Sequence, residues 1–367
     1  MSGGFRFAHS NGTDWQECVA RCAASLGKPA GGLGFIYFTD LLLPYAAEMV
    51  DTLKELTGVQ DWVGTVGIGI VATGAEYLGE PALALMVADI PSHSYRIFSG
   101  KRRAPLPGER TPTGFAAAHF GIVHGDPQTP DMADLVADMA ARVESGYLVG
   151  GLSSAAGDTV QVANEVLTGG LSGVVLASDV PVATRHTQGC TPLAARHVVT
   201  ECEDNIVVTL DGRPALDVFR EDVGEVLARD LRRAAEFMHV GFPVKGSDTG
   251  DYVVRNLVGI DPKNKLMAVG EIPEPGAALV FCKRDAQTAR EDLSRILTEL
   301  KREVPAARGA LYFSCVGRGE HMFGRRGGEL GLIRDAIGAV PLVGFFCNGE
   351  ISHDRLYGYT GVLTLFH

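Results

Sequence analysis

A short pattern that recurs along the chain restricts the fold more than any other feature. A helix is followed by Val-Gly and a new apolar strand at four places, Val63-Gly64, Val149-Gly150, Val240-Gly241 and Val343-Gly344. Around three of them, the segments 34–90, 119–178 and 310–366 share the order strand, helix, Val-Gly strand, turn, apolar strand. The segment around Gly241 matches least well because its flanking strands differ. The repetition predicts an α/β or α+β fold with duplicated strand-helix-strand-strand units, mixed sheets and helices packed outside.

The composition is that of a globular protein with an excess of glycine. Hydrophobic residues make up 46% and charged residues 21% of the 367 residues, which excludes disorder for most of the chain. Glycine accounts for 46 residues, well above the usual share of about 7%. It shows no Gly-X-Y period, which excludes collagen. The length predicts two or three domains.

Hydrophobic periodicity predicts helices and strands mixed along the whole length. The first helix, 14–26, starts with Asp14 and Glu17 as a capping box and ends at Gly27. Further amphipathic helices are predicted around 43–56, 131–145, 219–238, 286–303 and 328–338. Strands are predicted at 34–39, 63–71, 81–90, 119–124, 147–153, 173–178, 205–210, 252–258, 277–283, 310–316, 342–347 and 359–366.

Two breaks in this pattern indicate how the chain divides. The segment 91–118 is rich in proline and basic residues and is predicted to be a surface loop or linker. A second break lies near 212–219, where a strand and a turn give way to a helix. We therefore predict an N-terminal helix in residues 1–29 and two lobes, residues 30–218 and residues 219–367.

The charge and the cysteines favour a cytoplasmic protein. A formal net charge of −11 repels phosphate backbones, which makes general nucleic-acid binding unfavourable. The longest uncharged run, 62–75, is too short to cross a membrane, and the N-terminus lacks the apolar stretch of a signal peptide. Seven scattered cysteines then predict reduced thiols in a cytoplasm. The 25 arginines against eight lysines suggest a GC-rich bacterial genome.

The sequence lacks the common catalytic and cofactor motifs. There is no phosphate-binding G-x-x-x-x-G-K-[ST], H-E-x-x-H, C-x-x-C or G-x-S-x-G, so we expect neither a metal nor a cofactor. What remains are glycine-rich polar stretches that each follow an apolar run, at 151–155, 187–192, 314–319 and 345–351. Ligands commonly bind at strand ends, and glycine lets the backbone approach a ligand.

Together these stretches resemble the FIST family, whose two parts are named FIST-N and FIST-C. The matching stretches, in the family's order, are the glycine-rich strand near 62–74, LVGGLSSAAGD (148–158), TQGCTPL (187–193), the run 198–216, SCVGRG (314–319) and GFFCNGEI (344–351). The last two resemble in particular the FIST part of animal F-box proteins, although no F-box is evident before the match. The resemblance covers about residues 30–366. It implies a sensory module that binds small molecules such as amino acids and signals through a partner protein or its own oligomer.

We therefore expect a cytoplasmic small-ligand sensor whose ligand meets polar residues flanked by glycine. Arg318 is the candidate anchor for an anion and Glu350 the candidate partner for an amine, so an amino acid would find a countercharge for each end. The other candidate contacts are the side chains of Gln188 and Asn348, the backbone N–H groups of Ser153, Ser154 and Gly189, and residues Cys190, Cys315 and Gly317.

Three alternatives remain open on the sequence. Arg318 and Glu350 could form an internal salt bridge. Cys315 or Cys190 could be the nucleophile of an enzyme, with His186, His197 or His321 as its base. The chain could also be an adaptor that binds protein, although it offers no evident exposed apolar stripe.

Overall fold

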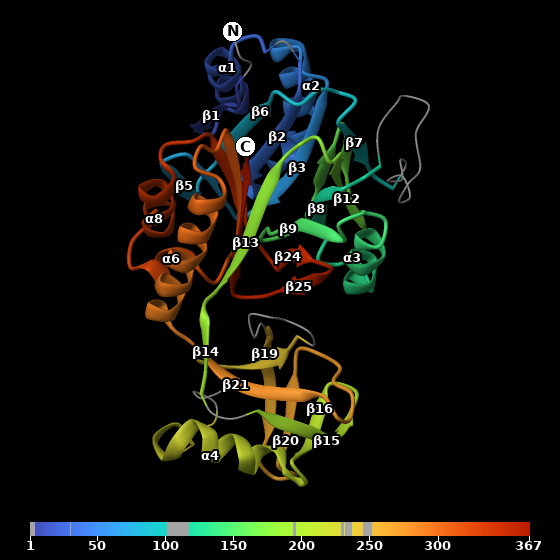
Figure 1. The fold of residues 1–367 in the computed structure, drawn as a ribbon, viewed down its shortest axis with the longest axis vertical. Coiled ribbons are helices and arrows are strands. Elements are labelled where there is room, and N and C mark those ends of the chain that lie inside the picture. The colour runs from blue at the N-terminus through green and yellow to red at the C-terminus, as the bar shows by residue number, and fades with distance from the viewer. Residues whose placement is uncertain are drawn as a thin grey trace. The chain divides into compact units, whose positions relative to one another are not determined.

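The computed structural model describes residues 4–29, 31–100, 117–193, 196–228, 231, 237–244 and 252–367 (Figure 1). The chain forms two compact units. Unit 1 contains Met1–Thr187 and Asp292–His367, and unit 2 contains Gln188–Glu291. Helices and strands alternate, and the sheets of unit 1 mix parallel with antiparallel pairs, so the predicted α/β class with mixed sheets and two lobes is confirmed.

Unit 1 is built from three repeats of one motif, which confirms the predicted duplication. In each repeat two neighbouring parallel strands are joined by a helical segment, and a third strand returns antiparallel to the first. Repeat 1 comprises β2 (Leu33–Thr39), α2 (Ala46–Thr57), β3 (Asp61–Gly67) and β6 (Ala82–Ala88). Repeat 2 comprises β8 (Phe120–Gly125), α3 (Met132–Ala140), β9 (Tyr147–Leu152) and β12 (Leu171–Leu176). Repeat 3 comprises β22 (Gly309–Cys315), α8 (Gly328–Ile337), β23 (Leu342–Cys347) and β26 (Thr360–Phe366).

The repeats exchange hairpins in a cycle. Each repeat carries a two-stranded hairpin between its second and third strands, and this hairpin joins the sheet of another repeat. The hairpins are β4 (Gly69–Ala72) with β5 (Ala75–Leu78), β10 (Gln161–Ala163) with β11 (Val166–Leu167), and β24 (Glu350–His353) with β25 (Arg355–Tyr357). The first strand of each hairpin makes the pairing: β4 pairs with β23, β10 with β3 and β24 with β9. The edge strands β1 (Arg6–Asn11), β7 (Tyr95–Phe98) and β13 (Val182–Gln188) complete three six-stranded sheets. We number each sheet after the repeat that supplies its parallel pair.

Close approach of the parallel strands explains the recurring Val-Gly steps. A Cβ atom added to Gly64, Gly150 or Gly344 would overlap the carbonyl oxygen of the residue paired with it on the first strand of the repeat. The valines before these glycines are buried in one shared core cluster. Each step therefore pairs a core side chain with a position where only glycine fits.

The fourth Val-Gly step has a different structural context. Gly241 lies in β18 (Met238–Pro243) of unit 2, between antiparallel neighbours. The atoms nearest to a Cβ atom there would be side-chain atoms of Tyr252 and Val280, whereas at the other three steps the nearest atom is a backbone carbonyl oxygen. The step at Gly241 is therefore not a fourth copy of the repeat, in keeping with its weaker match in the sequence.

The first strands of the three repeats meet through one ring each. These rings belong to Tyr37, His124 and Phe313. Each lies at the same position of its strand, directly opposite the residue that follows the Val-Gly glycine on the second strand of the repeat. The ring centroids of Tyr37 and His124 lie 5.6 Å apart, and each lies 6.2 Å from that of Phe313. The Tyr37 hydroxyl and Nε2 of His124 are 3.1 Å apart. Burial lowers the pKa of His124 to about 3, so this ring is neutral at the centre of unit 1.

Unit 2 is an antiparallel sheet that closes on itself. Its strands are β14 (Cys190–Pro192), β15 (His197–Glu203), β16 (Ile206–Leu210), β17 (Arg213–Pro214), β18, β19 (Tyr252–Asp261), β20 (Leu266–Val269) and β21 (Ala278–Arg284). Pairing of β18 with β21 closes the ring β21-β15-β16-β20-β19-β18. Helix α4 (Ala215–Ala228) packs on it through Leu216 and Phe219, which are buried with Phe281.

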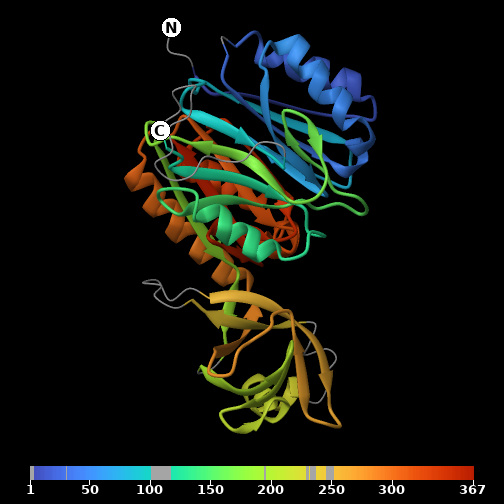
Figure 2. The ribbon, with the colours of Figure 1, turned by 90° about the vertical axis from the view of Figure 1, so that its right-hand side faces the viewer.

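The remaining helices lie outside the sheets. Helix α1 (Trp15–Leu26) begins after Asp14, whose carboxylate accepts the backbone N–H of Glu17, and ends at Gly27, as predicted. Helices α1 and α2 lie side by side along one face of sheet 1 (Figure 2). The others are the 3-10 helix η1 (Asp40–Tyr45), α6 (Ala286–Glu303) and α7 (Gly319–Phe323).

Several local predictions differ from the structure. The predicted strand 63–71 is two strands, because the chain turns at Ile68 and passes from sheet 1 into sheet 3. Residues 6–11, taken as part of a helical N-terminus, form β1 and pair with β6. Strand β7 lies within the predicted loop 91–118, of which residues 101–116 are outside the described residues. Residues 229, 230 and 232–236 of the predicted helix 219–238 are also outside them.

Candidate functional site

Seven of the ten predicted binding residues lie in unit 1 and three lie in unit 2. Those in unit 1 are Ser153, Ser154, Cys315, Gly317, Arg318, Asn348 and Glu350, and those in unit 2 are Gln188, Gly189 and Cys190. The ligand-binding roles of all ten stay predictions.

The residues of unit 1 gather where the parallel strands of repeats 2 and 3 end. Cys315 and Cys347 are register partners at the ends of β22 and β23. The backbone of Leu152, at the end of β9, exchanges hydrogen bonds with Asn348 and Gly349, at 3.0 and 2.8 Å. The Ser154 hydroxyl donates to the carbonyl of Phe346. Two stretches that are about 200 residues apart in the sequence therefore form one surface of contact.

Arg318 is fully buried and pairs with a carboxylate that the sequence analysis did not identify. Its Nε and Nη2 atoms donate to Oε1 of Glu329, on α8, at 2.9 and 2.6 Å. Tyr312 and Ser314 donate hydroxyl protons to the same carboxylate, at 2.6 and 2.9 Å. The guanidinium also lies over the ring of Phe323, 5.3 Å from its centroid. The salt bridge considered between Arg318 and Glu350 is thus replaced by one between Arg318 and Glu329.

Glu350 is fully buried and lacks a full set of partners. Its Oε2 accepts hydrogen bonds from the backbone N–H and the hydroxyl of Thr360, at 3.1 and 2.8 Å. Its Oε1 is buried and has no hydrogen-bond partner among the described residues. Burial raises the pKa of Glu350 to about 8, against the opposing effect of Thr360 and of the Arg318 charge. Glu350 is therefore mostly protonated at neutral pH.

The repeats provide an internal comparison for Glu350. It lies in β24 opposite Gly151, the residue that follows the Val-Gly glycine of repeat 2. The same position in the other two hairpins is held by Gln161, opposite Thr65, and by Ile70, opposite Phe345. All three side chains are fully buried. Because glutamine and isoleucine fill the other two positions, the fold does not require an ionisable group there.

The thiols beside Glu350 are poor nucleophiles. Cys315 is only 8% exposed, and burial together with the Glu350 charge raises its pKa to about 12. Burial and the same charge raise the pKa of Cys347 as well. Since the thiolate is the reactive form, neither environment favours nucleophilic catalysis at neutral pH.

The predicted backbone donors of repeat 2 are already engaged. The N–H group of Ser153 donates to the carbonyl of Gly125 at 2.8 Å, and that of Ser154 to the carbonyl of Val66 at 3.4 Å. The Ser153 hydroxyl lies 2.6 Å from the hydroxyl of Thr65 and accepts from Nε2 of Gln161 at 3.1 Å. A ligand would have to displace these partners to use either N–H group.

The three candidates of unit 2 surround the start of its sheet. The side-chain amide of Gln188 donates to the carbonyl of Tyr252 at 3.1 Å, and the Tyr252 hydroxyl donates to the carbonyl of Cys190. The carbonyl of Gly189 accepts the N–H of Asp285 at 3.1 Å. Cys190 is buried, and its side chain hydrogen-bonds with that of Cys282, which together with burial raises the pKa of the Cys282 thiol.

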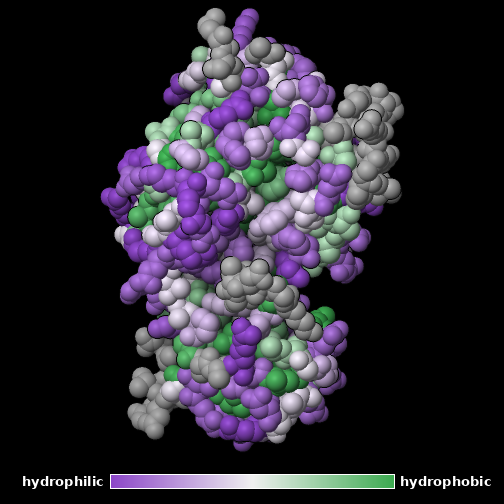
Figure 3. All heavy atoms as spheres, viewed as in Figure 1, coloured by the Kyte–Doolittle hydropathy of each residue, from purple (hydrophilic) through white to green (hydrophobic). Residues whose placement is uncertain are grey.

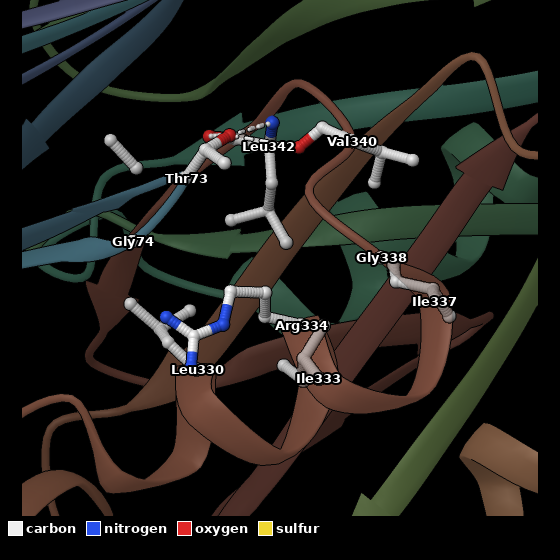
Figure 4. Close-up of a pocket in the computed structure, with 10 residues that line it drawn as sticks. Thr73, Gly74, Leu330, Ile333, Arg334, Ile337, Gly338, Val340 and Leu342 are labelled. Carbon is white, nitrogen blue, oxygen red and sulfur yellow. Dashed lines mark hydrogen bonds between the residues drawn. The ribbon is translucent and has the colours of Figure 1, made fainter.

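A hollow on the surface of repeat 3 lies apart from the predicted residues. It is bounded by α8, the turn between β4 and β5, and the start of β23 (Figure 4). Leu330, Ile333 and Leu342 make it apolar, and Thr73 closes one end through hydrogen bonds of 2.8 Å to Val340 and Leu342. Its volume of about 240 Å³ includes open solvent and is below that of usual ligand pockets. None of the ten predicted residues lines it.

The described residues were compared with the requirements of a clustered metal site and of a membrane-spanning helix. No group of three or more histidine, cysteine, aspartate or glutamate side chains is arranged there to hold a metal ion. No helix in the described residues is both long and apolar enough to cross a membrane. On the face shown in Figure 3, hydrophobic residues form small groups among hydrophilic ones.

Sequence reasoning missed the partners that complete the buried cluster. Glu329 lies in the first turn of α8, in a segment predicted only as a short amphipathic helix. Tyr312 and Ser314 belong to an apolar strand, and Thr360 begins the last strand. The sequence offered one signal for the pair of Arg318 and Glu329. Glu329 lies on the apolar face of a predicted helix, close in sequence to an arginine that stands between glycines.

The chain belongs to the FIST family. The FIST N domain matches residues 32–213, and the FIST C domain matches residues 215–353. FIST domains are generally described as sensory or signal-transduction domains. The boundary between the two matches lies inside unit 2, so the family domains and the compact units divide the chain differently. The predicted division at 218 and 219 stays a prediction.

Two mycobacterial proteins show the similarity over most of their length. The chain is 30% identical over 371 residues to uncharacterized protein Mb0898c of Mycobacterium bovis, which covers 95% of this chain and 94% of that one. It is 32% identical over 325 residues to uncharacterized protein Rv0628c of Mycobacterium tuberculosis, which covers 83% of each chain.

Proposed function

We propose that this protein is a cytoplasmic sensory module that binds a small ligand at the strand ends of repeat 3, with Glu350 as its central contact. The observation that carries the proposal is the buried Oε1 of Glu350, which has no partner among the described residues. A buried carboxyl group without a full set of hydrogen bonds is costly, and such groups are frequent at binding and catalytic sites. The glycine-flanked loops after β22 and β23 lie at the carboxyl ends of parallel strands, where ligands often bind.

The comparison among the repeats supports a functional reason for this cost. Gln161 and Ile70 occupy the positions equivalent to Glu350 and keep the hairpins in place without an ionisable group. A side chain that serves only packing would be expected to be non-ionisable, like these two. The acid in repeat 3 is therefore better explained by what it binds than by what it packs against.

The chemistry of Glu350 favours a ligand with an ammonium or another cationic group. Such a group would replace the proton of Glu350, so binding would release a proton. An amino acid is within this proposal. Its ammonium group would meet Glu350, and its carboxylate would have to share Arg318 with Glu329. Further proposed contacts are Asn348, Cys315 and Gly317, which border the same strand ends. The proposed roles of Gln188, Gly189 and Cys190 concern unit 2.

The cytoplasmic location is part of the proposal. All seven cysteines are free thiols in the structure, including the buried register pair Cys315 and Cys347. Reduced thiols are typical of cytoplasmic proteins. A sensory module also needs an output, and a signalling partner or a homo-oligomer is the proposed route.

A screen of small metabolites by thermal shift tests this proposal. We expect at least one amine-containing compound to raise the melting temperature of the natural protein, and the shift to disappear in Glu350→Gln. Gln161→Leu is the matched control, because it changes the equivalent buried position of another repeat and should leave the ligand shift intact. As the pH rises towards 8, the affinity should increase by up to about tenfold per pH unit, because Glu350 gives up its proton more readily. If no compound stabilises the protein, or if one stabilises Glu350→Gln equally, the proposal is wrong.

A further inference from the structure

A histidine in unit 2 is held between two carboxylates. His197 is the first residue of β15, and its Nδ1 lies 2.7 Å from Oδ2 of Asp211. Its Nε2 lies 2.9 Å from Oδ2 of Asp222. The side chains of His197 and Asp222 are each 13% exposed. Neither contact was anticipated from the sequence, where His197 was considered only as a base for a cysteine.

The two contacts identify the protonation state of the ring. Ionised carboxylates only accept hydrogen bonds, and a neutral imidazole has a single N–H group. Two short contacts to carboxylates therefore require the imidazolium form, in which both nitrogens donate. Burial lowers the pKa of His197, but the hydrogen bonds and charges of Asp211 and Asp222 outweigh this effect and raise it above its ordinary value.

The two carboxylates come from different elements. Asp211 belongs to the two-residue turn between β16 and β17, with a φ of 53° followed by 73° at Gly212, as in tight hairpins with Asp-Gly turns. Its Oδ1 also accepts the N–H of Val198 at 2.8 Å, so the turn is fixed to β15 independently of the ring. Asp222 belongs to α4, and among the described residues His197 is its only hydrogen-bond partner.

The helix has a break next to this contact. Gly224, two residues after Asp222, has the non-helical angles φ 77° and ψ 163°. Before the break, Phe219 packs on Phe281 with ring centroids 5.0 Å apart, and the His197 ring lies 5.9 Å from the same Phe281. Asp222 and Phe219 are three residues apart and share a face of α4. The His197 contact therefore fixes the last helical turn before a point where the backbone direction changes.

We propose that His197 is a proton-operated latch that joins α4 to the β16–β17 turn in unit 2. Protonated His197 bridges Asp211 and Asp222 and keeps the latch closed. When the ring loses a proton, only one of its nitrogens keeps a hydrogen. The other nitrogen then presents a lone pair to a carboxylate, which also can only accept, so that contact is lost and the bridge opens. Asp211 keeps its bond to Val198, and α4 around Asp222 becomes free to move about Gly224.

The direction of the effect follows from the raised pKa of His197. The latch is closed at low pH, and it opens as the pH rises through the raised value. The other charged groups beside it are the ion pairs Arg213–Glu221 and Lys265–Asp217, together with Arg220 next to Asp217. The carboxylates, lysine and arginines of these pairs keep their charges between about pH 6 and 9, so they do not produce a change in that range.

Histidine NMR and amide hydrogen exchange on the full-length protein test the latch. We expect His197 to show two protected ring N–H groups and to titrate above about 6.5. Exchange protection of the α4 amides 219–223, corrected for intrinsic rates, should fall about tenfold as His197 deprotonates.

Asp222→Asn provides the decisive variant. Its side-chain N–H can donate to the neutral ring, so protection of α4 should persist at high pH and the tenfold fall should vanish. The latch is refuted if His197 titrates at or below 6.5, if α4 protection in the natural protein does not depend on pH, or if Asp222→Asn retains the same fall. The first two outcomes, the titration of His197 and the pH dependence of α4 protection, are measured on the natural protein, so they decide the question even if the variant does not fold.

Discussion

The hairpins of repeats 2 and 3 occupy equivalent places and carry different chemistry. Gln161 and Glu350 each lie opposite the residue after a Val-Gly glycine, and each is fully buried with one oxygen that lacks a partner among the described residues. The neighbours differ: Gln161 donates to Ser153 in a neutral hydroxyl cluster, whereas Glu350 lies near two thiols and the Arg318–Glu329 pair. The scaffold is therefore shared among the repeats, and the ionisable chemistry is concentrated in one of them.

The largest predicted effect tests whether the scaffold is shared. Gly150→Ala and Gly344→Ala should each cost more than about 5 kcal/mol, enough to prevent folding, because the new Cβ overlaps a carbonyl oxygen of the paired strand. Gly241→Ala should cost only about 1–3 kcal/mol, since its Cβ meets side chains that can shift. Urea unfolding monitored by circular dichroism measures all three. Similar costs at Gly241 and Gly344 would contradict the structural distinction between the true repeats and the fourth step.

A second prediction compares the polar clusters at the strand ends of the two repeats. Glu329→Gln leaves the buried Arg318 guanidinium without its countercharge and should destabilise the protein by about 3–5 kcal/mol. Asp126→Asn, at the end of β8, weakens hydrogen bonds from Thr159 and two backbone N–H groups and should cost only about 1–2 kcal/mol. Denaturant midpoints of the two variants provide the measurement. Equal losses would mean that repeat 3 does not depend specially on its ion pair.

The elements that the sequence predicted are those with a strong local pattern. The parallel strands of each repeat consist mostly of apolar residues and are buried along nearly their whole length, and helices such as α6 show a clear polar and apolar face. The hairpin strands β10, β11, β24 and β25 were missed because they have only two to four residues and include polar side chains. Their exchange between repeats is a tertiary pairing, which no local pattern specifies.

The candidate site was predictable in part for the same reason. Glycines flanking Arg318 and Glu350 mark the turns after apolar strands, and the structure places these turns at neighbouring strand ends. The partner of Arg318 was not predictable from spacing, because Glu329 and Glu350 are both carboxylates at plausible distances along the chain. Both carboxylates are buried, and their positions in the fold decide between them: Thr360 holds Glu350, and the hydroxyl groups of Tyr312 and Ser314 hold Glu329 beside Arg318.

A third prediction exchanges the chemistry of the equivalent hairpin positions. Glu350 has a raised pKa of about 8, so its folded form holds a proton that the unfolded chain releases near pH 4.5. The stability of the natural protein should therefore fall relative to Glu350→Gln between about pH 5 and 8, by at most about 1.4 kcal/mol per pH unit. Gln161→Glu should create a similar fall at the other hairpin. Unfolding free energies measured at three pH values test this, and a pH-independent difference for Glu350→Gln would show that the acid is not buried as described.

The smallest predicted effect concerns the thiol that ends β22. Burial and the Glu350 charge raise the pKa of Cys315 to about 12, so its thiolate is scarce at neutral pH. Cys202 in unit 2 is partly exposed and serves as the reference. Mass spectrometry after brief iodoacetamide treatment at pH 7.5 should find Cys202 modified at least about tenfold faster than Cys315, and equal modification of both after unfolding in urea. Preferential labelling of Cys315 in the folded protein would instead restore the cysteine-dependent enzyme as an explanation for the chemistry of repeat 3.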